Sequence, residues 1–245
     1  MRSRSAFLTI NVAVLAAMVA VSLSVGASQI DGLLSALLNP GADTSAAQIL
    51  WQIRIPRIFT ALIVGAALGV AGALAQGATN NPLAEPAILG TSAGAALAVV
   101  IGVLANVVVI GSVGAMAIAA IGALLATLLT LRFATLERSV SPLNLVIIGL
   151  SLSATISAVV GLLTTAVSRS DARSISFWSF GSLALTNSND LIPLLIFTLV
   201  GFVIALVLAP KLDQLSLGDT TARHLGIDPR KVRRVALIAL AILIG

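Results

Sequence analysis

The sequence has no cysteine, a single histidine and few charged residues. The absence of cysteine excludes disulfides and thiolate metal sites, and one histidine cannot build an imidazole metal centre. Only 9% of the 245 residues are charged, whereas 58% are hydrophobic and the mean hydropathy is +1.11. Such a composition does not describe a water-soluble domain. We therefore predict an all-α, polytopic membrane helix bundle, one transmembrane domain over residues 1–245, with no metal site or cofactor.

The chain also lacks the motifs of several catalytic and energy-coupling classes. GxxxxGK[ST] does not occur, so the chain is not expected to bind ATP through a P-loop. Ser-His, HExxH and paired-Asp arrangements are missing as well, so it is not expected to be an enzyme. Ion-coupled secondary transporters, the main alternative class, usually place ionisable residues within their spans, and the predicted spans have none. Any ATP-driven process in which the chain takes part would need a partner protein that binds the nucleotide.

Long apolar runs predict about six complete spans and the start of a seventh, because a bilayer-spanning helix needs roughly 20 apolar residues. The first run could instead be a secretory signal, but its apolar core exceeds the roughly 7–15 residues of such signals. The third and fourth spans share one uncharged stretch that is too long for a single crossing and turns near 106–114. The predicted spans lie within 5–30, at 58–76, twice within 86–131, at 142–167, and at 191–208 with an end at Pro210, and the seventh begins at Val235.

Shorter features lie between these runs. Residues 29–52 are polar and read as an extramembrane loop with one short helix, and Trp51 suits the interfacial aromatic belt. Residues 176–190 are interrupted by Gly, Ser and Asn and read as a re-entrant or surface-lying helix. Gly65 and Gly69 are four apart in the second predicted span, a spacing that favours close helix packing in lipid.

The basic residues are distributed unevenly over the predicted loops. With the N-terminus in the cytoplasm, ten of the fourteen basic residues would lie inside, which agrees with the positive-inside rule. The net charge of +5 then reflects membrane orientation, and no nucleic-acid partner is expected. Arg54 and Arg57 would lie outside, against the rule, and an acidic partner there would supply a reason.

The one long charged stretch, 211–234, is predicted to be a cytoplasmic loop with two short helices. Asp219 can cap a helix that ends at Gly226, and Asp228 followed by Pro229 can start the next. The first of these helices is too short to be stable alone. It is expected to pack against the membrane surface or a cytoplasmic protein.

Several motifs together carry a family resemblance. RIPR, GAALGVAGALAQ, NPLAEPAILG with TSAGA after it, FWSFGSL and LGDTTARHLGI follow one another in this order. The chain resembles the FecCD-family permeases, the membrane subunits of ATP-driven importers for ferric siderophores, haem and cobalamin. Members of that family are similar over ten spans, so the resemblance implies a chain that is incomplete at its C-terminus. A fragment, a natural truncation and a non-functional remnant all remain open.

The resemblance implies a site at each face of the membrane. Arg54 and Arg57 resemble the extracytoplasmic arginines that dock glutamates of a substrate-binding protein. Four residues of the cytoplasmic loop match the coupling helices that seat on the ATPase subunit: Gly218, Asp219, Arg223 and Gly226.

The resemblance also implies two gates on the translocation pathway. Asn81 and Leu83 match the family's cytoplasmic gate, and Ser141 and Pro142 lie where the family has a second gate. Pro142 stands where other members often have a small hydroxyl residue, so the second gate departs from the family pattern.

The implied function is import of a ferric siderophore or a similar metal chelate, such as haem or cobalamin, by alternating access across a bacterial cytoplasmic membrane. The implied partners are a cytoplasmic ATP-binding subunit, an extracytoplasmic substrate-binding protein, a second permease subunit of the same or a different chain, and membrane lipid.

Overall fold

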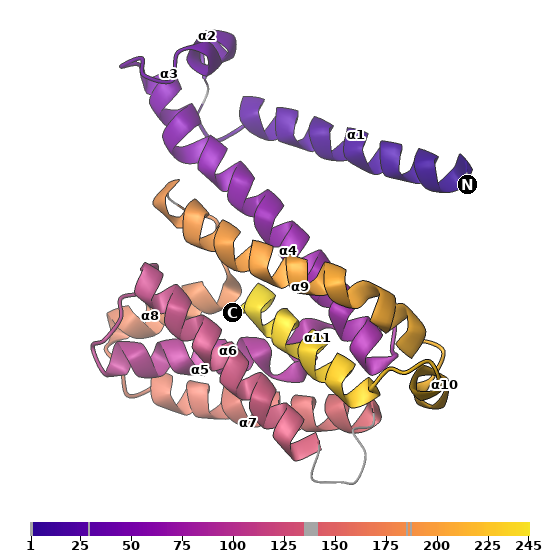
Figure 1. The fold of residues 1–245 in the computed structure, drawn as a ribbon. Coiled ribbons are helices and arrows are strands. Elements are labelled where there is room, and N and C mark those ends of the chain that lie inside the picture. Colours follow the sequence, from indigo (N-terminus) through magenta and orange to yellow (C-terminus); the bar gives the residue numbers. More distant parts are fainter. Residues whose placement is uncertain (1, 29, 135–141, 185, 187) are drawn as a thin grey trace. The chain divides into compact units, whose positions relative to one another are not determined.

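The computed structural model describes residues 2–28, 30–134, 142–184, 186 and 188–245, and every regular element in these residues is a helix (Figure 1). Five helical segments are long and apolar enough to cross a membrane, which confirms the all-α membrane class. The remaining predicted span, the third, is the helix α5 (Thr91–Leu104), whose 14 residues extend only about 21 Å and fall short of a hydrocarbon core of about 30 Å. The five segments are Ser5–Ser24, Ser45–Thr79, Val113–Ala134, Pro142–Thr164 and Ser188–Leu215.

The chain forms two compact units, of which the first comprises 1–62 and 183–192. Its small core consists of Ala36, Ala47 and Leu50, and the Trp51 indole packs against them while its Nε1 donates to the Ala36 carbonyl oxygen over 3.0 Å. The loop predicted with one short helix therefore has two, α2 and α3, joined to a π-helical turn. The elements of this unit are α1 (Arg2–Ser24), α2 (Leu33–Leu38), α3 (Ser45–Gln48), the π-helix η1 (Ile49–Arg54), the beginning of α4 (Ile55–Thr79), the 3-10 turn η3 (Ser188–Asp190) and the first residues of α9 (Leu191–Leu215).

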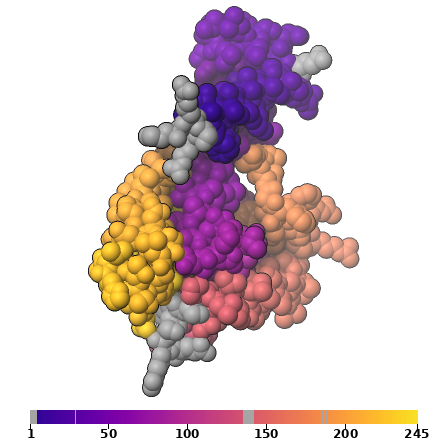
Figure 2. Space-filling model, turned by 90° about the vertical axis from the view of Figure 1, so that its right-hand side faces the viewer, coloured from indigo at the N-terminus to yellow at the C-terminus, as the bar shows by residue number. Residues whose placement is uncertain are grey.

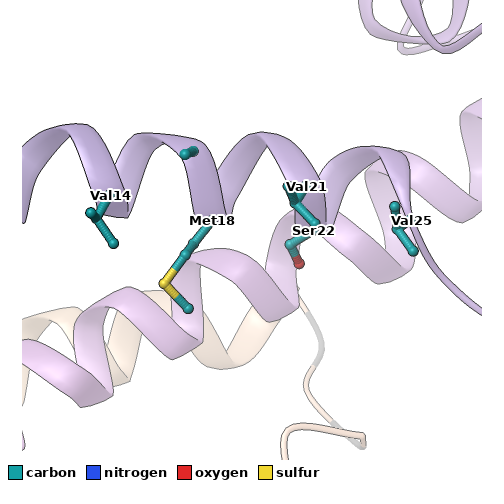
Figure 3. A pocket seen from close by; sticks show the side chains of 6 residues that line it. Val14, Met18, Val21, Ser22 and Val25 are labelled. Atoms are coloured by element: carbon teal, nitrogen blue, oxygen red, sulfur yellow. The ribbon is translucent and has the colours of Figure 1, made fainter.

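Helix α1 is apolar around its whole circumference, and none of the side chains in its hydrophobic window is buried. Figure 3 shows Val14, Met18, Val21 and Val25 along one side of the helix, where they line a shallow depression. A helix with this all-round apolar surface is suited to lipid contact rather than to water.

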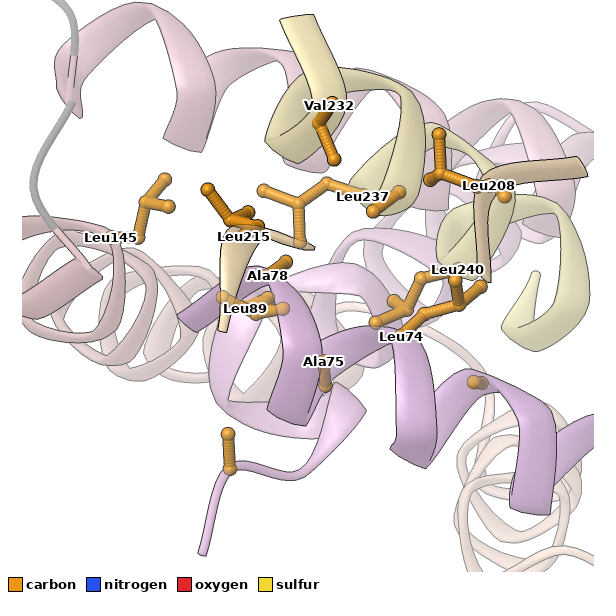
Figure 4. Close-up of a cluster of buried hydrophobic side chains, with 14 of the residues drawn as sticks. Leu74, Ala75, Ala78, Leu89, Leu145, Leu208, Leu215, Val232, Leu237 and Leu240 are labelled. Carbon is orange, nitrogen blue, oxygen red and sulfur yellow. The ribbon is translucent and has the colours of Figure 1, made fainter. Parts of the chain in front are cut away.

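The second unit comprises 63–182 and 193–245 and contains the larger core. Leu74 and Ala78 of α4 pack with Leu208 of α9 and with Leu237 and Leu240 of the last helix, α11 (Figure 4). In Figure 2, α11 (yellow) lies beside α4 (purple), as this shared core requires. Besides parts of α4 and α9, the unit contains the 3-10 turn η2 (Pro86–Leu89), α5, α6 (Val113–Ala134), α7 (Pro142–Thr164), α8 (Arg169–Phe180), α10 (Asp219–His224) and α11 (Pro229–Ile244).

Helices α5 and α6 cross at two glycines. A Cβ atom added to Gly94 would lie 2.5 Å from the Gly122 carbonyl oxygen, so only glycine allows these backbones to approach so closely. The turn between the two helices falls where the sequence predicts it, at Asn106 (φ 55°) and Gly111 (φ 85°).

Two local predictions were wrong, and a third, on Gly65 and Gly69, finds no packing neighbour among the described residues. Helix α9 runs through Pro210 to Leu215 instead of stopping at the proline, which membrane helices tolerate because neighbouring groups satisfy the freed backbone. Gly65 and Gly69 are exposed, and a Cβ atom at either would meet nothing within 4 Å among the described residues. Helix α8 begins earlier than predicted, where the Ser168 side chain caps it, and it ends earlier because Gly181, with φ 73°, follows its last residue.

Candidate functional site

The charged stretch 211–234 contains the end of α9, the predicted first short helix as α10, and the first residues of α11, which is longer than predicted. Gly226 has φ 81°, the left-handed conformation expected of a residue that follows a helix. The Asp228 carboxylate accepts from the backbone N–H of Arg230 over 2.9 Å and of Lys231 over 3.4 Å, and Pro229 occupies the first turn of α11. Asp228 is thus confirmed as an N-cap.

Asp219 does not cap α10, which corrects the prediction. The N-cap position belongs to Gly218, and Asp219 is the first helical residue. Its carboxylate instead accepts two hydrogen bonds from the Arg233 guanidinium, from Nη1 over 2.9 Å and from Nη2 over 2.6 Å. These hydrogen bonds hold the pKa of the Asp219 carboxyl below its usual value, with the charges of Arg233 and Arg223 acting in the same direction and burial acting against them.

Arg233 is a site residue that the sequence reasoning missed. Its side chain is 1% exposed, and its Nε donates to the Ala78 carbonyl oxygen over 2.9 Å. A signal was available, because Arg233 lies three, four and seven residues before Ala236, Leu237 and Leu240, on the buried face of α11. A charge at such a position is buried only where it is paired.

The surface around α10 mixes polar and apolar side chains. Arg223 and His224 are exposed, and so are the two leucines that flank the helix, Leu217 at 63% and Leu225 at 54%. Ala222, on the opposite face, is fully buried and fixes the helix to the core of the second unit.

The predicted gate loop begins where α4 ends. Asn80 has φ 51°, and the Asn81 backbone N–H donates to the Gln76 carbonyl oxygen over 3.2 Å. The Asn81 Oδ1 accepts from the Leu83 N–H over 2.9 Å, and the Gln76 amide donates to the Pro82 carbonyl oxygen over 3.0 Å. The loop is therefore tied to the last turns of α4, and Leu83, 85% exposed, projects from it.

After the gate loop, the turn η2 is held by hydroxyl groups. The Thr91 hydroxyl donates to the Pro86 carbonyl oxygen over 2.9 Å, the Thr130 hydroxyl to that of Leu89 over 3.1 Å, and the Ser153 hydroxyl to that of Ala87 over 3.3 Å. Backbone groups that lie outside a regular helix thus find partners within the protein.

The second predicted gate is only partly described. Ser141 lies outside the described residues, and Pro142 is the first residue of α7, where it is half-buried. Further along α7, a Cβ atom at Gly149 would lie 2.5 Å from the Ile88 carbonyl oxygen, so α7 approaches η2 closely.

The two predicted docking arginines differ in environment. Arg54 is 8% exposed and donates to the Leu23 carbonyl oxygen over 2.6 Å and to that of Ser28, so its guanidinium is engaged within the first unit. Arg57 is exposed and donates to the Ala184 carbonyl oxygen over 2.8 Å. Both line a groove of about 340 Å³.

Comparison with known proteins identifies the family. The model of the FecCD transport family matches residues 13–245. The chain belongs to the FecCD transport family. This FecCD permease is 32% identical over 235 residues to the hemin transport system permease protein HmuU of Yersinia pestis, covering 92% of this chain and 69% of that protein. It is 34% identical over 232 residues to the ferric enterobactin transport system permease protein FepD of Escherichia coli, covering 92% and 68%.

A solved structure has the same fold. An ABC transporter of metal-chelate type in an inward-facing conformation matches the FecCD permease with a TM-score of 0.72 and 29% sequence identity, over 97% of this chain and 75% of that one. The predicted family, the transport class and the multi-pass location in a cytoplasmic membrane are thereby confirmed. The FecCD permease is a transporter subunit and not an enzyme. The N-terminal orientation and the roles of the site residues stay predictions.

Proposed function

We propose that this permease is the membrane subunit of an importer that moves a ferric siderophore, or a related chelate such as haem or cobalamin, by alternating access driven by a separate ATPase. The relatives support a chelate of this class, since their names specify hemin, ferric enterobactin and vitamin B12 as cargo. A metal chelate would enter as substrate, so the permease needs no metal ligands of its own.

The surface of α10 carries the proposal. The helix has six residues, too few for independent stability. It is held in place by the buried Ala222 and by the Asp219–Arg233 ion pair. Leu217 and Leu225, on either side of the helix, are exposed among polar neighbours. Apolar side chains within a polar rim are the composition of a protein interface, and the ATP-binding subunit is the partner that such an importer needs on the cytoplasmic face.

Leu83 supports the gate. An 85% exposed leucine on a loop whose backbone is tied to α4 is held out from its own chain, and it needs an apolar partner to leave water. A second permease subunit is such a partner, and a second copy of this chain would bring its own Leu83 to the contact. Two such loops in contact would close the pathway to the cytoplasm.

At the other face, the two arginines divide the docking role. Arg57 is exposed and is the residue available to a carboxylate of the substrate-binding protein. Arg54 is buried among backbone carbonyl groups and positions the segment that carries Arg57. The predicted pair of docking residues thus becomes one docking arginine and one supporting arginine.

The test is a charge placed on the α10 surface. Leu225→Asp should lower co-purification with the ATP-binding subunit, and ATP-driven chelate uptake by proteoliposomes, at least tenfold, because a carboxylate would have to be desolvated in the interface. Leu38→Asp, at a 72% exposed leucine in the first unit, is the matched control and should change neither. Wild-type binding and uptake in Leu225→Asp would contradict the proposal, and uptake driven by an ion gradient without ATP would favour the alternative class.

A further inference from the structure

Among the described residues, Arg233 joins three segments that are distant in the sequence. Its own helix is α11, its Nη1 and Nη2 bond the carboxylate of Asp219 at the start of α10, and its Nε bonds the carbonyl oxygen of Ala78, 155 residues away in the last turn of α4. All three segments belong to the second unit. One fully buried side chain therefore connects the predicted ATPase-facing helix with the end of the helix that leads into the gate loop.

The connection needs arginine specifically. The guanidinium is planar and presents Nε, Nη1 and Nη2 in a fixed fork, so one side chain can serve a carboxylate bidentately and a carbonyl group at the same time. A lysine has a single ammonium group on a flexible stem and cannot reproduce this geometry. The carbonyl of Ala78 is among the last four of α4, which lack a partner within the helix, so a cation is also favoured there by the helix dipole.

Ala78 and the gate residue Leu83 are close in the sequence, so a movement at Ala78 can reach the gate. Leu83 is five residues beyond Ala78, and the intervening loop is bonded to α4 at Gln76 through both Asn81 and Pro82. A displacement of the end of α4 would therefore move Leu83 with it, because packed, hydrogen-bonded elements transmit shifts rather than absorb them.

We propose that Arg233 is the positioning residue that transmits the movement of α10 to the gate loop. ATP hydrolysis in the subunit bound to α10 would thereby move Leu83 and open or close the gate. This inference rests on the proposed function, in which α10 contacts the ATP-binding subunit. Arg233 itself is 1% exposed, so in this proposal it acts through α10 and not by its own contact with the ATP-binding subunit or the chelate.

The sequence offers a direct assay, because it contains no cysteine. Leu83→Cys gives a single thiol on the gate loop, whose labelling rate by a maleimide is measured in the complex with the ATP-binding subunit, with and without ATP plus vanadate. In this background, Arg233→Lys should abolish the nucleotide-dependent change in labelling. In the parent sequence, it should lower the chelate transported per ATP hydrolysed at least tenfold. Arg234→Lys, at the exposed neighbouring arginine, is the control and should change neither quantity.

The ratio of transport to hydrolysis separates coupling from folding. If Arg233 only stabilises the fold, Arg233→Lys lowers the yield or the melting temperature, but the surviving complex keeps the wild-type ratio and labelling change, and the inference is overturned. Should Arg233→Lys fail to fold, Asp219→Asn removes only the charge at the other end of the link, and an unchanged ratio there overturns it equally. Failure of the wild-type permease to bind an ATP-binding subunit would instead overturn the proposed function, and the inference with it.

Discussion

A valine at Gly94 is a sharp test of the fold, because this residue sets the distance between α5 and α6. Even the first added atom, the Cβ, would lie 2.5 Å from the Gly122 carbonyl oxygen, and it would also meet the Ala126 methyl group. Ordinary contacts of this kind are about 3.5 Å or longer, so the two helices would have to separate by about 1 Å. The cluster of Ala95, Val99, Ala119 and Ala123 that they share would then lose contacts.

The magnitude follows from two opposing terms. Forcing extra methyl groups into a packed interior costs about 1–3 kcal/mol, and a clash with backbone on two rigid helices belongs at the upper end. Replacing glycine by valine within a helix returns about 0.3–0.5 kcal/mol through helix propensity. The net loss is about 2 kcal/mol or more, which for a chain of this size corresponds to a fall in melting temperature of about 4–8 °C.

The assay is thermal unfolding of the detergent-solubilised protein, followed by size-exclusion chromatography with fluorescence detection. Gly161→Val is the matched control, since Gly161 is an exposed glycine of α7 at which an added Cβ atom meets no atom of the described residues within 4 Å. It should melt within about 2 °C of the wild type, because exposed substitutions usually stay within about 0.5 kcal/mol. A Gly94→Val protein that melts as the control does would refute the close crossing of α5 and α6.

Four further predictions concern the membrane faces and the coupling segment. A cysteine at Ser170 should react with an impermeant thiol reagent outside intact cells and one at Thr221 should not, and the reverse pattern would overturn the cytoplasmic N-terminus. Arg57→Glu should slow association of the substrate-binding protein about tenfold and weaken its salt dependence, as measured by surface plasmon resonance, whereas an unchanged on-rate would leave Arg57 as a lipid anchor. Gly226→Val should cost on the order of 1 kcal/mol or more locally, because its φ is 81°, and should reduce pull-down of the ATP-binding subunit without affecting membrane insertion. Because the folded-state pKa of Asp219 is lowered, its ion pair stabilises the fold above the ordinary carboxyl pKa of about 4, and this stabilisation is lost as the pH falls through the lowered value. Melting curves between pH 6 and pH 3 should show the loss in the wild type and lack it in Asp219→Asn.

The sequence predicts those features that depend on local chemistry. Uncharged apolar runs locate the long helices, and the turn at Asn106 and Gly111 follows from residues that adopt positive φ. Asp228 and Gly226 were found for the same reason, since an N-cap and a helix-ending glycine act within a few residues of themselves. The third predicted span corresponds to α5, a helix of 14 residues, because hydropathy measures polarity and not helix length.

The site depends on contacts that no local rule contains. Arg233 and Ala78 are 155 residues apart in the sequence. Judged from its neighbours alone, Asp219 is equally suitable as an N-cap and as a partner of a distant arginine. Arg54 is similar, because its partners, the carbonyl groups of Leu23 and Ser28, precede it by 31 and 26 residues. The sequence reasoning named Arg54 as a docking residue and counted Arg233 only as a loop cation. The fold shows that both are buried and which groups they hold.

The hydroxyl groups that hold η2 bear on the order in which the protein is assembled. Thr130 and Ser153, which serve the carbonyl groups of Leu89 and Ala87, lie 41 and 66 residues later in the chain. While the ribosome has not yet delivered α6 and α7 to the bilayer, the turn at 86–89 has no such partners and cannot settle among lipid tails, where an unsatisfied carbonyl group costs several kcal/mol. We therefore expect this segment to stay at the water-facing surface or in the insertion machinery until the two later helices have arrived.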